Sequence, residues 1–274
     1  MPNPSALARV DRPLVMGVLN VTPDSFSDGG RWATTEEAVA QGRRLVAEGA
    51  DIVDVGGESS RPGAGPVPEA AELARVIPVI EALADSVRVS VDTVKPAVAV
   101  AALRAGATLV NDVSASLFEV AASAGAGWVA MHRQGSPRTM QDDPHYDDVV
   151  AEVRRFLVER AREARAAGVA EVWIDPGIGF GKTKEHNLIL LHHLPELVAA
   201  AVEAGCVGLM VGTSRKRFLG LLAGPDGAEA AGVEDRLEGS LATAVGAMVA
   251  GASMVRVHDV AATVQAARLY GPAA

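Results

Sequence analysis

One stretch of the sequence decides the fold: Glu171-Val-Trp-Ile-Asp-Pro-Gly-Ile-Gly-Phe-Gly-Lys-Thr183. Its apolar start predicts a buried strand that ends at Asp175. Pro176 cannot continue a strand ladder, and the three glycines that follow permit backbone angles that other residues avoid. A buried strand that stops at a carboxylate and opens into a glycine-rich loop brings a polar group to the mouth of a pocket.

The same arrangement of strand, polar residue and helix recurs along the chain. Short β-branched runs predict strands at 14–19, 51–55, 87–91, 108–110, 128–131, 172–174, 207–211 and 254–257. Ala-rich amphipathic segments separate them and predict helices, including one continuous helix over 184–204. The loop after 207–211 precedes two helical pieces, split by a turn at 224–227.

Eight such units in about 260 residues favour an α/β fold with one domain over residues 1–274, a closed (β/α)8 TIM barrel. The active site of such a barrel lies at the carboxyl ends of its strands. Residues 1–12 are expected to form a flexible N-terminal extension. An open doubly wound sheet is the alternative, but it normally has a glycine-rich turn after the first strand, where this chain has Asn20-Val-Thr-Pro23.

The composition narrows the function classes. Hydrophobic residues make up 49% of the chain and aromatic residues only 4%, so the core must be built from small aliphatic side chains. A net charge of −9 argues against a general nucleic-acid binder. Cys206 is the only cysteine, which predicts no disulfide and fits a reducing compartment, the cytoplasm. The longest uncharged run, 239–255, is too short and too rich in glycine for a membrane span.

Polar residues follow most of the predicted strands: Asn20, Glu58, Asp92, Asn111, His132, Asp175, Ser214 and His258. In a barrel these ends converge on one face. Many of them are ordinary loop formers, but that does not explain Arg256 and His258, which share one face of an apolar strand. Asp92, Asp175 and Asn111 suit a flat polar heterocycle, whereas Asn20, Lys216, Arg256 and His258 suit a phosphate.

Several standard motifs are excluded. The triplet Gly181-Lys182-Thr183 matches the last three residues of a P-loop motif. However, Pro176 occupies the position where that motif needs its first glycine. The sequence has no H-E-x-x-H and no paired cysteines, which makes a zinc site improbable. His192-His193 is expected within a helix, as a solvated or core histidine pair. Arg215-Lys216-Arg217 is too small a cluster for nucleic-acid binding in an acidic protein.

Four stretches resemble the bacterial dihydropteroate synthase family: Asn20-Val-Thr-Pro-Asp-Ser-Phe-Ser-Asp-Gly-Gly30, Gly56-Gly-Glu-Ser-Ser-Arg-Pro-Gly63, Asp175-Pro-Gly-Ile-Gly-Phe-Gly-Lys182, and Ser214-Arg-Lys216 with Arg256-Val-His258. The resemblance extends over nearly the whole chain from Leu14. It implies a (β/α)8 barrel that joins 6-hydroxymethyl-7,8-dihydropterin diphosphate to 4-aminobenzoate and releases diphosphate.

The resemblance also implies roles for individual residues. The pterin is expected on Asp92, Asn111, Asp175 and Lys216. The diphosphate is expected on Asn20, Arg256 and His258, with Asn20 also binding Mg²⁺. The 4-aminobenzoate pocket is expected from Phe26, Ser60, Arg61, Pro62, Phe180 and Ser214. Asp28, Arg61 and Lys216 are the expected catalytic residues.

An Mg²⁺-assisted, SN1-like loss of diphosphate is implied, followed by attack of the arylamine, which needs no strong base. Intact loops without an insertion predict competitive inhibition by sulfonamides, and the resemblance implies a homodimer through the last helices.

Two alternative functions share the pterin site. One is a pterin-binding methyltransferase, which has no use for diphosphate ligands. The other is a non-catalytic paralogue, which is expected to lose residues of the first two loops.

Overall fold

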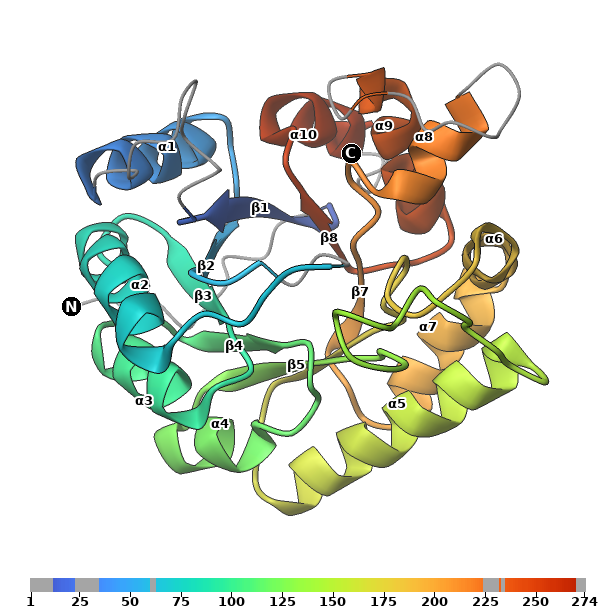
Figure 1. Ribbon diagram of the computed structural model, residues 1–274, viewed down its shortest axis with the longest axis horizontal. Coiled ribbons are helices and arrows are strands. Elements are labelled where there is room, and N and C mark those ends of the chain that lie inside the picture. Colours follow the sequence, from blue (N-terminus) through green and yellow to red (C-terminus); the bar gives the residue numbers. More distant parts are fainter. Residues whose placement is uncertain (1–11, 23–34, 60–62, 224–231, 233–234, 270–274) are drawn as a thin grey trace.

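A closed barrel of eight parallel strands forms the centre of the protein (Figure 1). The computed structural model describes residues 12–22, 35–59, 63–223, 232 and 235–269. The strands are β1 (Leu14–Asn20), β2 (Ile52–Gly56), β3 (Arg88–Asp92), β4 (Leu109–Asp112), β5 (Gly127–Met131), β6 (Val172–Asp175), β7 (Gly208–Val211) and β8 (Met254–Val257). They pair in chain order, and β8 pairs with β1. The predicted TIM barrel is confirmed, and each predicted strand overlaps an observed one.

Helices surround the barrel on its outside (Figure 1). They are α1 (Thr35–Ala47), α2 (Glu69–Leu83), α3 (Pro96–Arg104), α4 (Phe118–Ala124), α5 (Val149–Ala166), α6 (Lys184–His192), α7 (Leu194–Glu203), α8 (Arg217–Ala223), α9 (Leu237–Val249) and α10 (Val260–Arg268). In the described part of the chain, no helix is long and apolar enough to cross a membrane.

One predicted helix is wrong. The segment expected as a continuous helix over 184–204 is split into α6 and α7 at His193. Pro195 lies in the first turn of α7, where its missing N–H does not matter, but inside a longer helix it would leave a carbonyl unpaired. His193 is exposed at this break and contacts Glu196, with 2.6 Å between Nδ1 and Oε1.

The barrel has two apolar layers. Outward-facing strand residues pack against the helices in a large core of Val, Ala, Leu and Ile side chains. A separate cluster fills the barrel interior: Leu14, Met16, Ile52, Leu109, Val129, Trp173, Met210 and Met254. At the amino ends of the strands, Arg88 adds an ion pair with Glu171, with 2.7 Å between Nη2 and Oε2. The interior is therefore a packed core and not a channel.

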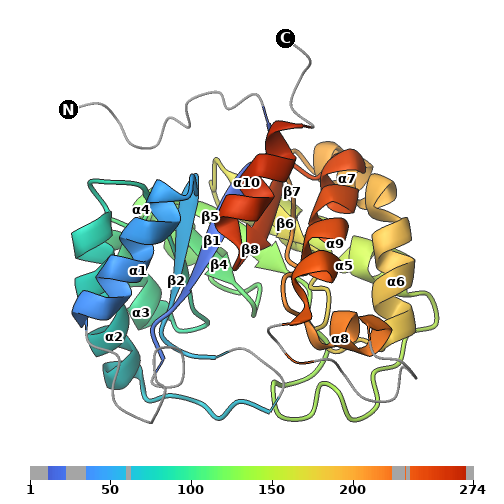
Figure 2. The same ribbon diagram turned by 90° about the horizontal axis from the view of Figure 1, so that it is seen from above.

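Inward-facing residues become polar toward the carboxyl ends of the strands. Since side chains two apart in a strand share a face, β2 presents Ile52 and then Asp54 to the interior. In β3, Ser90 pairs with Asp54, and Asp92 pairs with Gly56. The loops that follow β2 and β5 lie at one end of the barrel together with α8 (Figure 2). The fold thus gathers the polar residues of several strands below one group of loops.

Candidate active site

A cavity of about 830 Å³ opens at the carboxyl ends of the strands. Among its lining residues are seven predicted site residues: Asn20, Asp92, Phe180, Ser214, Lys216, Arg256 and His258. They come from β1, β3, β8 and the loops after β6, β7 and β8. The barrel therefore brings together groups from nearly the full length of the chain.

An ion-pair network occupies the base of the site. Arg256 Nε lies 2.7 Å from Asp54 Oδ2, and Arg256 Nη2 lies 2.8 Å from Asp92 Oδ2. Asn111 Nδ2 donates to the same Asp54 oxygen at 2.8 Å. Asp54 is fully buried and holds Arg256 and Asn111 in fixed orientations.

Three buried side-chain atoms around this network lack a hydrogen-bond partner within the described residues: Asp54 Oδ1, Ser90 Oγ and Asn111 Oδ1. Leaving a buried polar atom unpaired is costly, so such atoms mark places where a ligand or water is expected. The two carboxylate and amide oxygens can only accept hydrogen bonds. Their presence beside Asp92 suits a flat ligand with several N–H donors.

Three charged groups in or beside the cavity, Asp92, Asp175 and Lys216, have shifted pKa values. Burial, reinforced by neighbouring carboxylates, raises the pKa of Asp92 to about 7, although Arg256 acts in the opposite direction. Burial also lowers the pKa of Lys216 to about 8, which Asp175 opposes. The pKa of Asp175 is raised by burial, against the effect of Lys216. Shifts of this kind are frequent at functional sites.

The glycine-rich loop after β6 is fastened to the loop after β5. Asp175 Oδ1 accepts from Gly177 N at 2.7 Å, which turns the chain directly after the strand. Lys182 Nζ contacts His132 Nδ1 at 2.9 Å and donates to the carbonyls of Gly177 and Phe180 at 3.0 and 3.1 Å. Burial, aided by the charge of Lys216, lowers the pKa of Lys182 to about 7. Lys182 thereby supports the segment that carries Phe180 into the cavity.

We expect Gly177→Ala to lower the free energy of unfolding by about 3 kcal/mol. Gly177 has φ +64°, and a Cβ there would lie 1.8 Å from the carbonyl oxygen of His132. Gly125 also has φ +64° but has nothing within 4 Å of its Cβ position, so Gly125→Ala is a matched control with an expected loss of about 1 kcal/mol. Urea unfolding followed by circular dichroism measures both. Equal losses in the two variants would contradict a steric role for Gly177.

Lys216 lines the cavity and directly follows a residue in the left-handed backbone conformation. Arg215 has φ +58° and its guanidinium pairs with Asp259, with 2.6 Å between Nη2 and Oδ1. Lys216 follows this turn, donates to the carbonyl of Ile178, and places Nζ 4.5 Å from the centre of the Phe180 ring. The geometry is that of a cation–π contact, and it links the loops after β6 and β7.

Ser214 and His258 form the outer part of the site. Ser214 Oγ accepts from the backbone N–H of His258 at 3.1 Å and lies 3.1 Å from His258 Nδ1. Asn20, at the end of β1, is half-buried beside Gly56 of β2. Asn20, Ser214 and His258 thus place an amide, a hydroxyl and an imidazole at the cavity.

Four predicted strand-end residues do not line the cavity: Glu58, Asn111, His132 and Asp175. His132 is buried against Lys182 and Phe156, and Glu58 is turned toward Lys95. Asn111 and Asp175 are buried next to the cavity and are absent from its described lining. Phe26, Asp28, Ser60, Arg61 and Pro62 lie outside the described residues.

Asp54 and Ser90 were missed by the sequence reasoning. Both are polar residues inside otherwise apolar strands, which is the same signal that distinguished Arg256. They are found by applying the period of two to the whole strand, and not only to its last residue.

Comparison with known proteins identifies the family of the chain. Residues 16–258 match the model of a family described as pterin binding enzymes. Dihydropteroate synthase of Mycobacterium leprae is 49% identical over 270 residues, which cover 94% of this chain and 92% of the relative.

Two solved structures are also similar. The Yersinia pestis dihydropteroate synthase with a sulfonamide drug complex has a TM-score of 0.86 and 43% identity, covering 94% of this chain and 93% of that one. The Xanthomonas albilineans enzyme with 4-aminobenzoic acid has a TM-score of 0.85 and 50% identity, covering 95% and 92%. The chain therefore belongs to the pterin-binding enzymes, and within them to the dihydropteroate synthase family.

Proposed function

We propose that the protein condenses 6-hydroxymethyl-7,8-dihydropterin diphosphate with 4-aminobenzoate to give 7,8-dihydropteroate and diphosphate. The observation that carries this proposal is the cavity itself, which has acceptor groups at its base and cationic groups at its rim. Relatives with the same fold and nearly half of the same residues are dihydropteroate synthases.

The pterin binds at the base of the cavity in this proposal. Asp92 accepts two N–H donors from the edge of the ring, and the free oxygen of Asn111 accepts a further one. Asp175 and Lys216 complete the set from the loops after β6 and β7. Arg256 keeps Asp92 oriented through their 2.8 Å ion pair while it stays close enough to the rim to meet the diphosphate.

The diphosphate binds at the rim, on Asn20, Arg256 and His258. Among the described residues, no group of three His, Cys, Asp or Glu side chains is arranged to hold a metal ion. Mg²⁺ is commonly held by few protein oxygens together with waters and substrate phosphates. The amide oxygen of Asn20 fits that use, and Mg²⁺ bound there would neutralise the oxygens of the departing diphosphate.

The 4-aminobenzoate binds between the loops after β1, β2, β6 and β7, on Phe26, Ser60, Arg61, Pro62, Phe180 and Ser214. Arg256 and His258 stabilise the negative charge that builds on the diphosphate as it leaves. The pterin methylene carbon becomes electrophilic in this SN1-like step, and the aniline nitrogen attacks it. Asp28, Arg61 and Lys216 stabilise the reacting groups, and the loops exclude water. Sulfonamides compete for the same place as 4-aminobenzoate.

A turnover assay tests this proposal. Purified protein, Mg²⁺, the pterin diphosphate and 4-aminobenzoate are combined, and dihydropteroate and diphosphate are followed. We expect both products in equal amounts, dependence on Mg²⁺, and inhibition by sulfamethoxazole that excess 4-aminobenzoate reverses. Pterin binding without product would identify a non-catalytic pterin-binding protein instead.

We expect pterin affinity to be highest between about pH 7 and about pH 8, the pKa values of Asp92 and Lys216. As the pH falls below the pKa of Asp92, the carboxylate becomes protonated and loses acceptor capacity. As the pH rises above the pKa of Lys216, the ammonium loses its charge. Calorimetric titration of a pterin without diphosphate, corrected for the titration of the ligand, measures this. In Asp92→Asn, the loss of pterin affinity at low pH should disappear while the loss at high pH remains. A wild-type pterin affinity that does not change with pH would refute the assignment.

The protein is further proposed to act in the cytoplasm as a homodimer. The lone Cys206 supports a reducing compartment. On α9, Ala242, Gly246 and Val249 are exposed, and Val249 is 65% accessible. These residues lie on one helix face, three to four positions apart, where small side chains allow a second helix to approach closely.

A further inference from the structure

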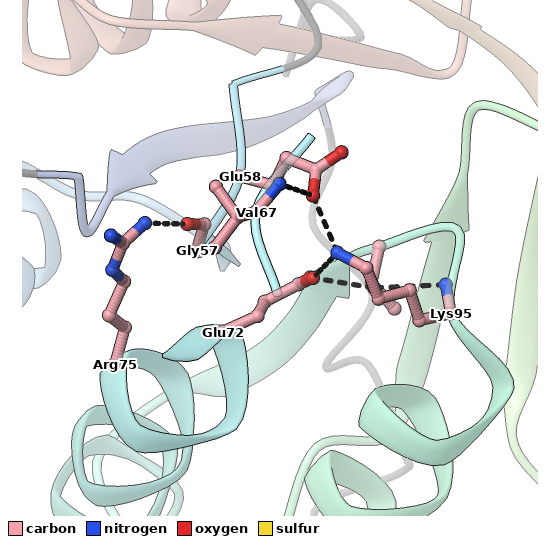
Figure 3. Close-up of polar contacts among 7 residues, drawn as sticks. Gly57, Glu58, Val67, Glu72, Arg75 and Lys95 are labelled. Atoms are coloured by element: carbon pink, nitrogen blue, oxygen red, sulfur yellow. Dashed lines mark hydrogen bonds and ion pairs between the residues drawn. The ribbon is translucent and has the colours of Figure 1, made fainter. Parts of the chain in front are cut away.

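We propose that Glu58, Glu72, Thr93 and Lys95, here called the Lys95 cluster, position the loop between Glu58 and Val67 for binding of 4-aminobenzoate. Figure 3 shows the ammonium of Lys95 between the carboxylates of Glu58 and Glu72. This inference rests on the proposed function, since it assigns part of that function to residues outside the cavity.

The cluster joins the two ends of the loop. Glu58 Oε2 accepts from Val67 N at 2.9 Å and from Lys95 Nζ at 2.5 Å. Arg75 Nη1 donates to the carbonyl of Gly57 at 2.8 Å, which ties the start of the loop to α2. A single carboxylate thus closes a ring of ten residues, from Glu58 to Val67, at its base. Glu58 and Val67, at the two ends of the loop, cannot move apart without breaking a charge-assisted hydrogen bond.

The same lysine connects the loop to the pterin side of the site. Lys95 Nζ donates to Glu72 Oε2, while Thr93 Oγ1 donates to Glu72 Oε1 at 2.7 Å. Thr93 directly follows Asp92, and Ser59 directly follows Glu58. Asp92 and Ser59 both line the main cavity. The cluster therefore fixes the chain one residue away from two sides of that cavity.

Burial makes this arrangement rigid. Glu72 is 1% exposed, both of its oxygens accept hydrogen bonds, and its ion pair with Lys95 compensates the buried carboxylate. Partial burial acts to lower the pKa of Lys95, but its hydrogen bonds to Glu58 and Glu72 outweigh this and raise it. Gly57 allows close contact here, because a Cβ would lie 2.8 Å from Val76 Cγ1 and 2.9 Å from Glu72 Cγ.

The cluster is not required to close the barrel. The backbone ladder between β2 and β3 is complete without it, from Ile52 with Arg88 to Gly56 with Asp92. A partly buried ion pair is present at the opposite end of the barrel, between Arg88 of β3 and Glu171, which directly precedes β6. The Lys95 cluster instead connects residues that follow the strands, so its effect is expected on ligand binding more than on folding.

Glu58→Ala is the test variant and Glu58→Gln its conservative partner. We expect Glu58→Ala to raise the KM for 4-aminobenzoate and the inhibition constant of sulfamethoxazole about tenfold, and to change the KM for the pterin diphosphate less than about twofold. Glu58→Gln keeps an oxygen that accepts from Val67 and Lys95, so its KM for 4-aminobenzoate should rise less than about threefold. Glu171→Gln controls for general destabilisation and should lower Tm without changing either KM.

Hydrogen exchange provides a readout that does not depend on turnover. The Val67 amide should exchange about tenfold faster in Glu58→Ala than in the wild type, and close to the wild-type rate in Glu58→Gln. A wild type that makes no dihydropteroate refutes the proposed function, and exchange still tests the cluster. If the wild type turns over, the positioning role is refuted by either of two results for Glu58→Ala. One is a Val67 amide that exchanges at the wild-type rate, and the other is an equal rise of the KM values for 4-aminobenzoate and the pterin diphosphate.

Discussion

Asp92→Asn is expected to lower kcat/KM for the pterin diphosphate about a thousandfold. The variant replaces one acceptor oxygen with an N–H₂ group, so a donor of the ring faces a donor of the protein. It also removes the charge that pairs with Arg256 at 2.8 Å, which leaves Asp54 as the ion-pair partner of Arg256 among the described residues. The loss therefore combines weaker pterin binding with a less well oriented guanidinium for the diphosphate.

Steady-state kinetics with varied pterin diphosphate measures this loss, and calorimetry with a pterin separates binding from turnover. Asp142→Asn is the matched control. Asp142 also lines the cavity but is exposed on the loop after β5, and its replacement should change kcat/KM less than about twofold. Similar losses in the two variants would mean that the charge of the cavity matters and the position of Asp92 does not.

Lys216→Ala is expected to lower kcat/KM for both substrates about a hundredfold. Lys216 contacts the carbonyl of Ile178 and the ring of Phe180, and its charge acts on Asp175. Its removal takes a donor from the pterin and frees Phe180, which lies on the side assigned to 4-aminobenzoate. The pKa of Asp175 should also rise, since it loses the positive charge that opposes the effect of burial.

The neighbouring Arg217→Ala is the control for this variant. Arg217 lines the same cavity but is exposed at the start of α8. We expect its replacement to cost less than about threefold in kcat/KM. If Lys216→Ala lost activity toward the pterin diphosphate alone, the contact with Phe180 would have no part in the binding of 4-aminobenzoate.

The barrel and some of the polar residues at the carboxyl ends of its strands were predictable from sequence. Period-two runs and amphipathic helices depend on residues close together in the chain, so the strands were found within a few positions. The split between α6 and α7 is predictable too, because Pro195 is a local signal for the start of a helix. Asp54 and Ser90 were also within reach, as polar residues in apolar strands.

The direction of individual side chains was not predictable. Glu58 and His132 follow their strands as Ser214 and His258 do, but they turn to Lys95 and Lys182 instead of lining the cavity. Their partners come from other β/α units, and no local rule names them.

The sequence by itself determined the order of strands and helices, the glycine loop after β6, and the set of polar residues at the strand ends. Only the tertiary structure decided which of these residues line a common cavity and which contact the surrounding loops without lining it. Arg256 and Asp54 are 202 residues apart and meet because β8 pairs with β1, which pairs with β2. Closure of the barrel sets these distances, and closure depends on every strand at once.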